Sequence, residues 1–224
     1  SQDKKGKEYY NFIKNSEVNR KTVLDVGCSC GGVIKYFQDM GSSVEGLDYD
    51  TKYVEFGKRK GLKLLNGNSN ILKEDKKYDL IILSHVVEHF NDPVKELTKL
   101  VKHLNKDGHI FINVPGIKFC SYYKRYTFSF LFYIQNAHIY YFTLNTLINI
   151  TRKASLECIN GNEKVFAIFK FNSGLIKQEI INEFSDITQL LKNIENKSYS
   201  RLFYYYLNEV FYNIPKRILK FIIK

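Results

Sequence analysis

A glycine-rich turn from Asp25 to Gly32 carries the residues best suited to bind a small ligand. It reads Asp-Val-Gly-Cys-Ser-Cys-Gly-Gly and lies where an apolar run (22–28) meets a segment with helical spacing (32–40). Glycine lets a backbone approach a ligand without a Cβ clash, and a helix N-terminus offers free N–H groups to an anion such as a carboxylate. The turn therefore predicts a site for a small molecule that bears a carboxylate.

A single carboxylate follows on the next apolar run. Asp48 lies near the end of the run 43–50, 23 residues after Asp25. Ligands of open α/β sheets bind at the carboxyl ends of the strands. A carboxylate at that place can accept hydrogen bonds from both hydroxyls of a ribose. The two motifs together indicate a ligand that contains a nucleoside.

Three of the five histidines could supply a base. His85 ends the apolar run 78–85, His89 follows it, and His138 lies in a later aromatic segment. Histidine titrates near neutrality, which suits it to deprotonate a hydroxyl acceptor. The sequence does not choose among the three, and each could equally be a hydrogen-bonded histidine of the core or of a hinge.

These residues need a scaffold in which strands alternate with helices. Apolar runs typical of buried strands occupy residues 22–28, 43–50, 63–68, 78–85 and 109–115. Helical spacing or capping signals occupy residues 4–14, 32–40, 52–60, 92–104 and 143–155. Residues 156–170 are typical of an antiparallel hairpin. The alternation predicts an α/β fold with a mostly parallel sheet, helices on both faces and an antiparallel last strand.

Two segments interrupt this alternation. Residues 117–141 are dense in tyrosine and phenylalanine and predict a lid, which could line a substrate pocket or simply pack on the domain. Residues 171–224 predict a helical appendage. Its aromatic and basic end, residues 201–224, could lie on a membrane or dock onto the lid or a second subunit. We therefore expect a main domain over residues 1–170 followed by this appendage.

Composition narrows the setting of the protein. The 224 residues carry a net charge of +11, which favours an anionic partner, although a lysine-rich solvated surface gives the same balance. The cysteines form no C-x-x-C pair, and free thiols are typical of reducing compartments; they are Cys28, Cys30, Cys120 and Cys158. The N-terminus is polar, and no apolar run reaches about 18 residues. We expect a cytoplasmic monomer or homodimer, either free or at the inner membrane.

Together these motifs resemble those of class I S-adenosylmethionine-dependent methyltransferases. VLDVGCSCGG is similar to their D/E-x-G-x-G-x-G motif, although Ser29 stands in place of the middle glycine. The resemblance continues through GLDYD and residues 67–69, 79–93 and 108–116. Residues 137–147 resemble a segment of bacterial glycan-pathway methyltransferases, and the Glu-His pair at 88–89 recurs in methyltransferases related to quinone O-methylation. The similarity covers roughly residues 1–170.

The resemblance implies a Rossmann-like fold with a seven-stranded sheet and S-adenosylmethionine as the cofactor. Asp48 is expected to hold the ribose, and the loop 27–32 the methionine end. Asn68 and Ser69 are expected to bond the adenine edge, and Ser84 to lie under the sulfonium. The implied cofactor-binding residues are Asp25, Gly27, Cys28, Ser29, Gly31, Gly32, Asp48, Tyr49, Asn68, Ser69, Ser84 and His85.

The resemblance further implies O-methylation of a small acceptor in surface-polysaccharide biosynthesis, either a sugar or an anionic, nucleotide-linked compound. A quinone-type lipid precursor stays open because of the aromatic and basic C-terminal end. Transfer RNA stays open on net charge alone, and we expect a small molecule in place of a nucleic acid. A scaffold that binds the cofactor without chemistry has only the Ser29 departure in its favour.

Other patterns in the same residues fit their context poorly. Residues 27–31 spell the G-x-S-x-G of hydrolases, but that fold needs several strands before the motif. A dinucleotide fold prefers G-x-G-x-x-G. Residues 85–89 spell H-x-x-E-H, which zinc peptidases carry inside a long helix. Two imidazoles and a carboxylate could still bind a divalent metal there, or Glu88 and His89 could stabilise the loop; we assign no metal ligand.

Overall fold

The computed structural model describes residues 2–122, 133–175, 179–208, 210–211 and 214. The chain forms two compact units, Ser1–Gly116 with His138–Asn182 and Ile117–Ala137 with Glu183–Lys224. The predicted boundary at residue 170 and the lid role of residues 117–141 stay predictions. Part of the predicted lid and the basic end of the chain lie outside the described residues, namely Tyr123, Tyr126, Phe128, Phe130, Phe132 and 215–224.

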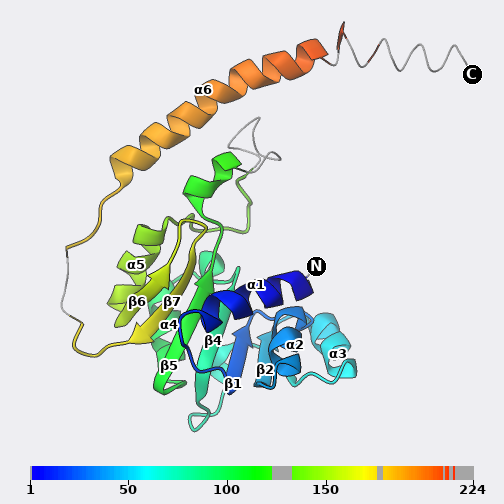
Figure 1. The fold of residues 1–224 in the computed structure, drawn as a ribbon, viewed down its shortest axis with the longest axis vertical. Coiled ribbons are helices and arrows are strands. Elements are labelled where there is room, and N and C mark those ends of the chain that lie inside the picture. The colour runs from blue at the N-terminus through cyan, green and yellow to red at the C-terminus, as the bar shows by residue number, and fades with distance from the viewer. Residues whose placement is uncertain (1, 123–132, 176–178, 209, 212–213, 215–224) are drawn as a thin grey trace, which may run out of the picture. The chain divides into compact units, whose positions relative to one another are not determined.

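A seven-stranded sheet forms the centre of the first unit (Figure 1). Its strands are β1 (Thr22–Val26), β2 (Ser43–Asp48), β3 (Leu64–Asn66), β4 (Tyr78–Ser84), β5 (Leu104–Asn113), β6 (Leu156–Gly161) and β7 (Phe166–Phe171). Their order across the sheet is β3-β2-β1-β4-β5-β7-β6. The first five strands in this order are parallel to one another, and β7 is antiparallel to both of its neighbours, β5 and β6. The connections change direction between β1 and β4, where α/β sheets open a crevice for ligands. The predicted fold is confirmed.

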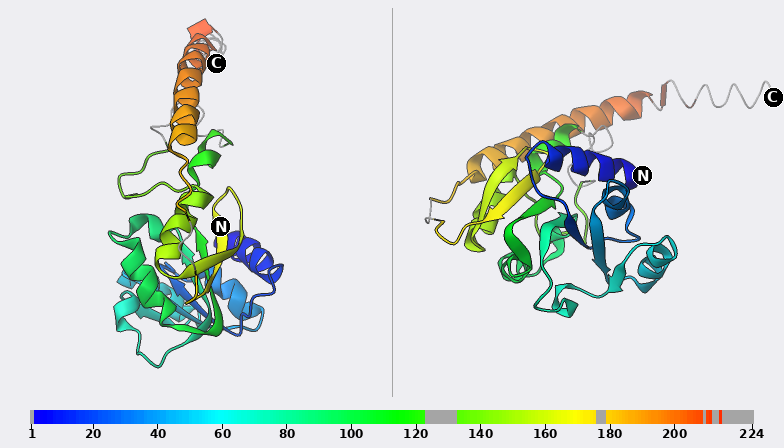
Figure 2. Two further views of the ribbon diagram at one scale, coloured as in Figure 1. Left: turned by 90° about the vertical axis from the view of Figure 1, so that its left-hand side faces the viewer. Right: turned by 60° about the horizontal axis from the view of Figure 1, so that its bottom comes forward.

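Helices cover both faces of this sheet (Figure 2). One face carries α1 (Gln2–Lys14), α2 (Gly32–Asp39) and α3 (Thr51–Arg59), and the other α4 (Pro93–Val101) and α5 (Leu144–Lys153). Successive strand residues point to opposite faces. Leu80 and Ile82 therefore lie in the core with α2, while Ile81 and Leu83 lie in the core with α4. Burial on both faces explains why β4 is a continuous apolar run.

The connection between α4 and β5 differs from the prediction. The sequence predicts a helix to Leu104 and a strand from residue 109, but α4 ends at Val101 and β5 already begins at Leu104. Leu104 pairs with Tyr78 of β4, and a bulge follows before regular pairing resumes at His109. The prediction is wrong here because the bulge carries the polar residues 105–107, so the apolar pattern of the strand begins only after it.

The second unit contains η3 (Ile117–Tyr122) and α6 (Phe184–Asn208), which contact each other. Just before α6, Glu183 is buried and accepts a hydrogen bond from Lys118, with 2.5 Å between Oε1 and Nζ. Phe203 and Tyr206 on α6 are exposed. Every helix within the described residues is too short or too polar to span a bilayer. The predicted contact of residues 201–224 with a membrane, a lid or a second subunit stays a prediction.

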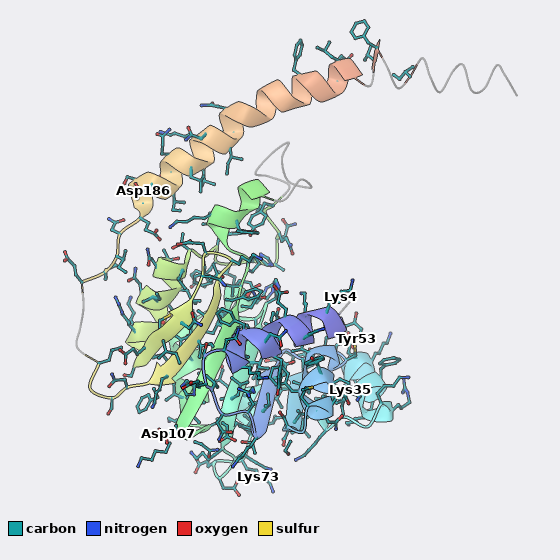
Figure 3. All side chains as sticks on the ribbon, in the orientation of Figure 1. Lys4, Lys35, Tyr53, Lys73, Asp107 and Asp186 are labelled. Atoms are coloured by element: carbon teal, nitrogen blue, oxygen red, sulfur yellow. The ribbon has the colours of Figure 1, made fainter. Side chains whose placement is uncertain are left out.

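Several charged side chains of the first unit face solvent. Lys35, Lys73 and Asp107 point away from the ribbon (Figure 3). Lys35 pairs with Asp39 one turn further along α2. Exposed pairs of this kind contribute only about 0–1 kcal/mol to stability, so these charges affect solubility and partner choice more than the fold.

Candidate functional site

The glycine-rich loop joins β1 to α2 at the carboxyl end of a central strand. Gly27 and Gly31 have φ angles of +74° and +81°, and Ser29 between them has +52°. A left-handed φ suits glycine and costs a residue with a Cβ about 1–2 kcal/mol. Ser29 thus adopts a left-handed φ, which glycine tolerates best, at the position where the D/E-x-G-x-G-x-G motif has a glycine.

Replacing Gly27 by alanine should destabilise the protein more than φ alone requires. A Cβ at Gly27 would lie 2.5 Å from Cγ2 of Val86, whereas one at Gly41 would meet nothing within 4 Å despite a φ of +92°. We expect Gly41→Ala to lower the free energy of unfolding by about 1–2 kcal/mol, and Gly27→Ala by about 2 kcal/mol more because of the clash. Chemical denaturation measures both. Equal losses would show that Val86 does not restrict the loop.

Asp48 ends β2 beside this loop and is half-buried. One carboxylate oxygen accepts from the Ser29 N–H at 2.7 Å, and the other accepts from the Asp50 N–H at 2.8 Å. A carboxylate oxygen has two lone pairs, so each oxygen keeps one for a ribose hydroxyl. The side chain can therefore fix the loop and bind a nucleoside at the same time.

Asp25 and Cys28 lie beneath the loop, and both side chains are buried. Burial and the nearby charge of Asp48 raise the pKa of Asp25 well above its ordinary value. Burial also raises the pKa of the Cys28 thiol, so this thiol is protonated at neutral pH. Oδ1 of Asp25 has no hydrogen-bond partner in the described part of the chain. Burial of both groups therefore favours their uncharged forms.

The predicted adenine-binding residues lie after β2 and β3. The Tyr49 hydroxyl accepts from Nδ2 of Asn68 at 2.6 Å, and Oδ1 of Asn68 accepts from the Asn70 N–H at 2.9 Å. Ser69 differs, because its buried hydroxyl donates to Oε2 of Glu96 on α4 at 3.4 Å. The structure thus brings Tyr49 and Asn68 together and directs the Ser69 side chain to α4. Their contact with adenine stays a prediction.

A polar network at the ends of β4 and β5 escaped the sequence analysis. Tyr9 of α1 is buried, and its hydroxyl donates to Oδ1 of Asn113 at 2.8 Å and pairs with Oγ of Ser84 at 2.9 Å. Burial raises the pKa of Tyr9 to about 12, so the hydroxyl keeps its proton. Ser84 and Asn113 are polar residues that end apolar strands. This position was the one signal in the sequence that could have indicated a polar network there. Nothing in the sequence connects them with Tyr9.

Removing the Tyr9 hydroxyl should measurably destabilise the protein. Tyr9→Phe keeps the ring and leaves Oδ1 of Asn113 buried without its donor, so we expect a loss of about 1–3 kcal/mol in the free energy of unfolding. The adjacent Tyr10→Phe is a matched control, because the Tyr10 ring packs edge-on against Tyr36 and Phe37 and would keep that packing. Urea denaturation of both variants tests this. Equal stabilities of the two variants would show that the network does not stabilise the protein.

The three candidate histidines gather around Glu88. The short helix η2 (Val87–His89) follows β4 directly, and His85 before it has a left-handed φ of +56°. Nδ1 of His85 lies 3.4 Å from Oε1 of Glu88. The rings of His89 and His138 meet edge to face, with 4.9 Å between their centroids. The N–H of Ile139 donates to the Glu88 carbonyl at 2.9 Å, which brings His138 to this place.

Glu88 is the unusual member of this group. Its side chain is 0% exposed, and neither carboxylate oxygen has a hydrogen-bond partner among the described residues. Burial lowers the pKa of His138, although the Glu88 charge acts in the opposite direction. One ligand atom from each of Glu88, His89 and His138 lies within 4.8 Å of the others. This arrangement can hold a cation, although the sequence assigns no metal ligand.

Comparison with known proteins identifies a methyltransferase family and relatives that are named as transferases. Residues 5–160 match the model of a family described as a methyltransferase domain. A ubiquinone biosynthesis O-methyltransferase of Pelagibacter ubique (strain HTCC1062) is 34% identical over 111 residues, covering 45% of this chain and 45% of that protein. A tRNA U34 carboxymethyltransferase of Campylobacter lari is 30% identical over 126 residues, covering 50% of this chain and 43% of that protein. The chain spans less than half the length of these two curated relatives.

Solved structures share the fold at low identity. An S-adenosylmethionine-dependent methyltransferase from Clostridium acetobutylicum ATCC 824 has a TM-score of 0.59 and 13% identity, covering 76% of this chain and 92% of that one. A TehB-like methyltransferase from Corynebacterium glutamicum has a TM-score of 0.53 and 16% identity, covering 73% and 88%. Because the family match extends over well more than half of the sequence, we conclude that this chain belongs to the methyltransferase domain family.

Proposed function

We propose that this protein transfers the methyl group of S-adenosylmethionine to a hydroxyl oxygen of a quinone-type precursor. His85 carries the proposal, because it stands at the tip of β4 next to Ser84 and faces the buried carboxylate of Glu88. Curated relatives named ubiquinone biosynthesis O-methyltransferase support this acceptor class. They give no support to the sugar or phosphorylated acceptor of polysaccharide biosynthesis that the sequence analysis expected first.

Most of the catalytic effect would come from alignment. S-adenosylmethionine supplies an activated methyl group on a sulfonium, so the protein must orient the acceptor in line and exclude water. The loop 27–32 and Asp48 would hold the cofactor, with Ser84 kept in place by Tyr9. These residues set the position of the methyl group relative to the end of β4.

His85 would act as the base in this reaction. The acceptor oxygen forms a bond to the methyl carbon, the sulfur keeps the electron pair of the broken bond, and the hydroxyl proton passes to the imidazole. The resulting imidazolium is stabilised by the Glu88 carboxylate, 3.4 Å from Nδ1. His89 and His138 contact each other and are further candidates for this role only if His85 is dispensable.

A methylation screen with isotopically labelled S-adenosylmethionine tests the proposal. The acceptors are a hydroxylated aromatic quinone precursor, a set of sugar nucleotides, and tRNA, which the Campylobacter lari relative and the net charge of +11 keep as the second candidate. We expect label on the phenolic oxygen alone. Label on a sugar or on tRNA with none on the phenol would overturn the acceptor class. Binding of S-adenosylhomocysteine without turnover on any acceptor would indicate a scaffold.

A further inference from the structure

The hydroxyl of Tyr9 has one proton and two hydrogen-bond partners, so the directions of its two bonds are linked. It donates to Oδ1 of Asn113 at 2.8 Å, and it lies 2.9 Å from Oγ of Ser84. A phenolic hydroxyl can donate only once. Because its proton goes to Asn113, Tyr9 must accept at the second contact, and Ser84 must be the donor there. The pKa of Tyr9, raised by burial to about 12, keeps the phenol protonated at neutral pH.

The direction of this chain of hydrogen bonds decides what Ser84 can offer to a ligand. A serine hydroxyl has one proton and two lone pairs. With the proton donated to Tyr9, the oxygen can act toward a ligand only as an acceptor. Tyr9 and Asn113 are buried, whereas Ser84 is half-buried and keeps part of its surface open. An oxygen that presents only lone pairs attracts a positive group.

Strand pairing places Ser84 beside the glycine-rich loop. Val26 of β1 pairs with Leu83 of β4, so Gly27 and Ser84 are the next residues of two adjacent parallel strands, which run about 5 Å apart. Successive strand residues point to opposite faces of a sheet. Ile82 lies in the core with α2, and Ser84, two residues later, points to the same face. The loop also leads into α2, so the Ser84 hydroxyl lies on the side of the sheet where the loop begins its helix.

We propose that the Ser84 oxygen faces the sulfonium of S-adenosylmethionine, and that Tyr9 fixes the Ser84 proton and so favours this charged cofactor over its thioether product. The inference rests on the proposed function, which holds the cofactor across the tips of these strands. Tyr9 is buried and acts through Ser84, so it is a positioning residue. The acceptor-only oxygen of Ser84 is the part that responds to the charge on sulfur.

Such a contact can separate two ligands that are otherwise alike. S-adenosylmethionine and S-adenosylhomocysteine share the adenosine and the amino-acid group, and they differ in the methyl group and the positive charge on sulfur. Asp48 and the loop 27–32 would therefore hold both ligands equally. An oxygen that attracts only the charged form lets the product leave more readily than the cofactor, without any movement of the loop.

Calorimetry with each of the two ligands in the absence of any acceptor tests the proposal through the ratio of their dissociation constants. Ser84→Ala removes the oxygen, and Tyr9→Phe leaves the Ser84 proton free to turn toward the ligand. We expect each variant to weaken S-adenosylmethionine about fivefold or more beyond its effect on S-adenosylhomocysteine. Tyr10→Phe is the matched control, because the Tyr10 ring packs against Tyr36 and Phe37. It should keep the wild-type ratio, as should Ser84→Thr, which keeps the hydroxyl.

The ratio separates this role from a purely structural one. A loosened α1 or β4 would weaken both ligands alike, so equal losses in Ser84→Ala would overturn the inference, as would a wild-type ratio in Tyr9→Phe. Ser84→Ala changes a half-buried position and tests the contact even if Tyr9→Phe does not fold. Failure of the wild type to bind either ligand would overturn the proposed function together with this inference. Binding of both ligands with a ratio that no variant changes would overturn the inference alone.

Discussion

Replacement of Asp48 by alanine should weaken binding of S-adenosylhomocysteine by at least about 100-fold. The carboxylate is expected to accept hydrogen bonds from both ribose hydroxyls. A hydrogen bond to a charged group contributes about 1.5–3 kcal/mol to the free energy of the interaction. The substitution also removes the acceptor of the Ser29 N–H and thus the contact that holds the loop against β2. Isothermal titration calorimetry with S-adenosylhomocysteine measures the effect.

Asp50→Ala separates binding from stability in the same experiment. Asp50 caps α3, where its Oδ1 accepts from the N–H groups of Lys52 and Tyr53 at 2.8 and 3.2 Å. Loss of such a cap costs about 1 kcal/mol of stability, so the variant should be less stable while its affinity changes by only a few fold. Similar affinity losses in Asp48→Ala and Asp50→Ala would show that Asp48 does not hold the ribose.

His85→Gln should lower kcat by about 10²- to 10⁴-fold, the usual contribution of a general base, and change the affinity for S-adenosylhomocysteine by far less. Glutamine keeps a polar side chain at the tip of β4 but cannot take up the proton. The measurement is kcat with the phenolic acceptor found in the screen. His103→Gln is the control, because Nδ1 of His103 bonds the Lys76 carbonyl, away from Glu88. This variant should keep the kcat of the wild type. A near-wild-type kcat in His85→Gln would show that His85 is not the general base.

The sequence was informative wherever one local pattern determines one local structure. The continuous apolar run of β4 requires burial on both faces, and this predicts helices on both sides of a parallel sheet. Glycines at 27 and 31 predict a sharp turn, and both have left-handed φ angles. Because the loop follows β1 and Asp48 ends β2, the sequence predicts that they are neighbours. The structure shows the contact, since the Ser29 N–H donates to Asp48.

Contacts between distant segments were not predictable in this way. The hydroxyl of Tyr9 contacts Asn113, 104 positions along the chain. The ring of His138 contacts that of His89, and the adjacent Ile139 N–H donates to the Glu88 carbonyl. Periodicity reports which face of an element is buried but not which residue lies opposite. The start of β5 was missed for a related reason, because a bulge with polar residues interrupts the apolar alternation at Leu104.

The Asp48 carboxylate already accepts from the N–H groups of Ser29 and Asp50 in the protein alone, so a nucleoside that binds there would meet a preorganised loop. The loss of conformational entropy in this loop would then belong to folding, and binding of the proposed cofactor would not have to provide for it. A substitution that loosens the loop would then weaken binding of the cofactor even if the substituted side chain does not contact the cofactor.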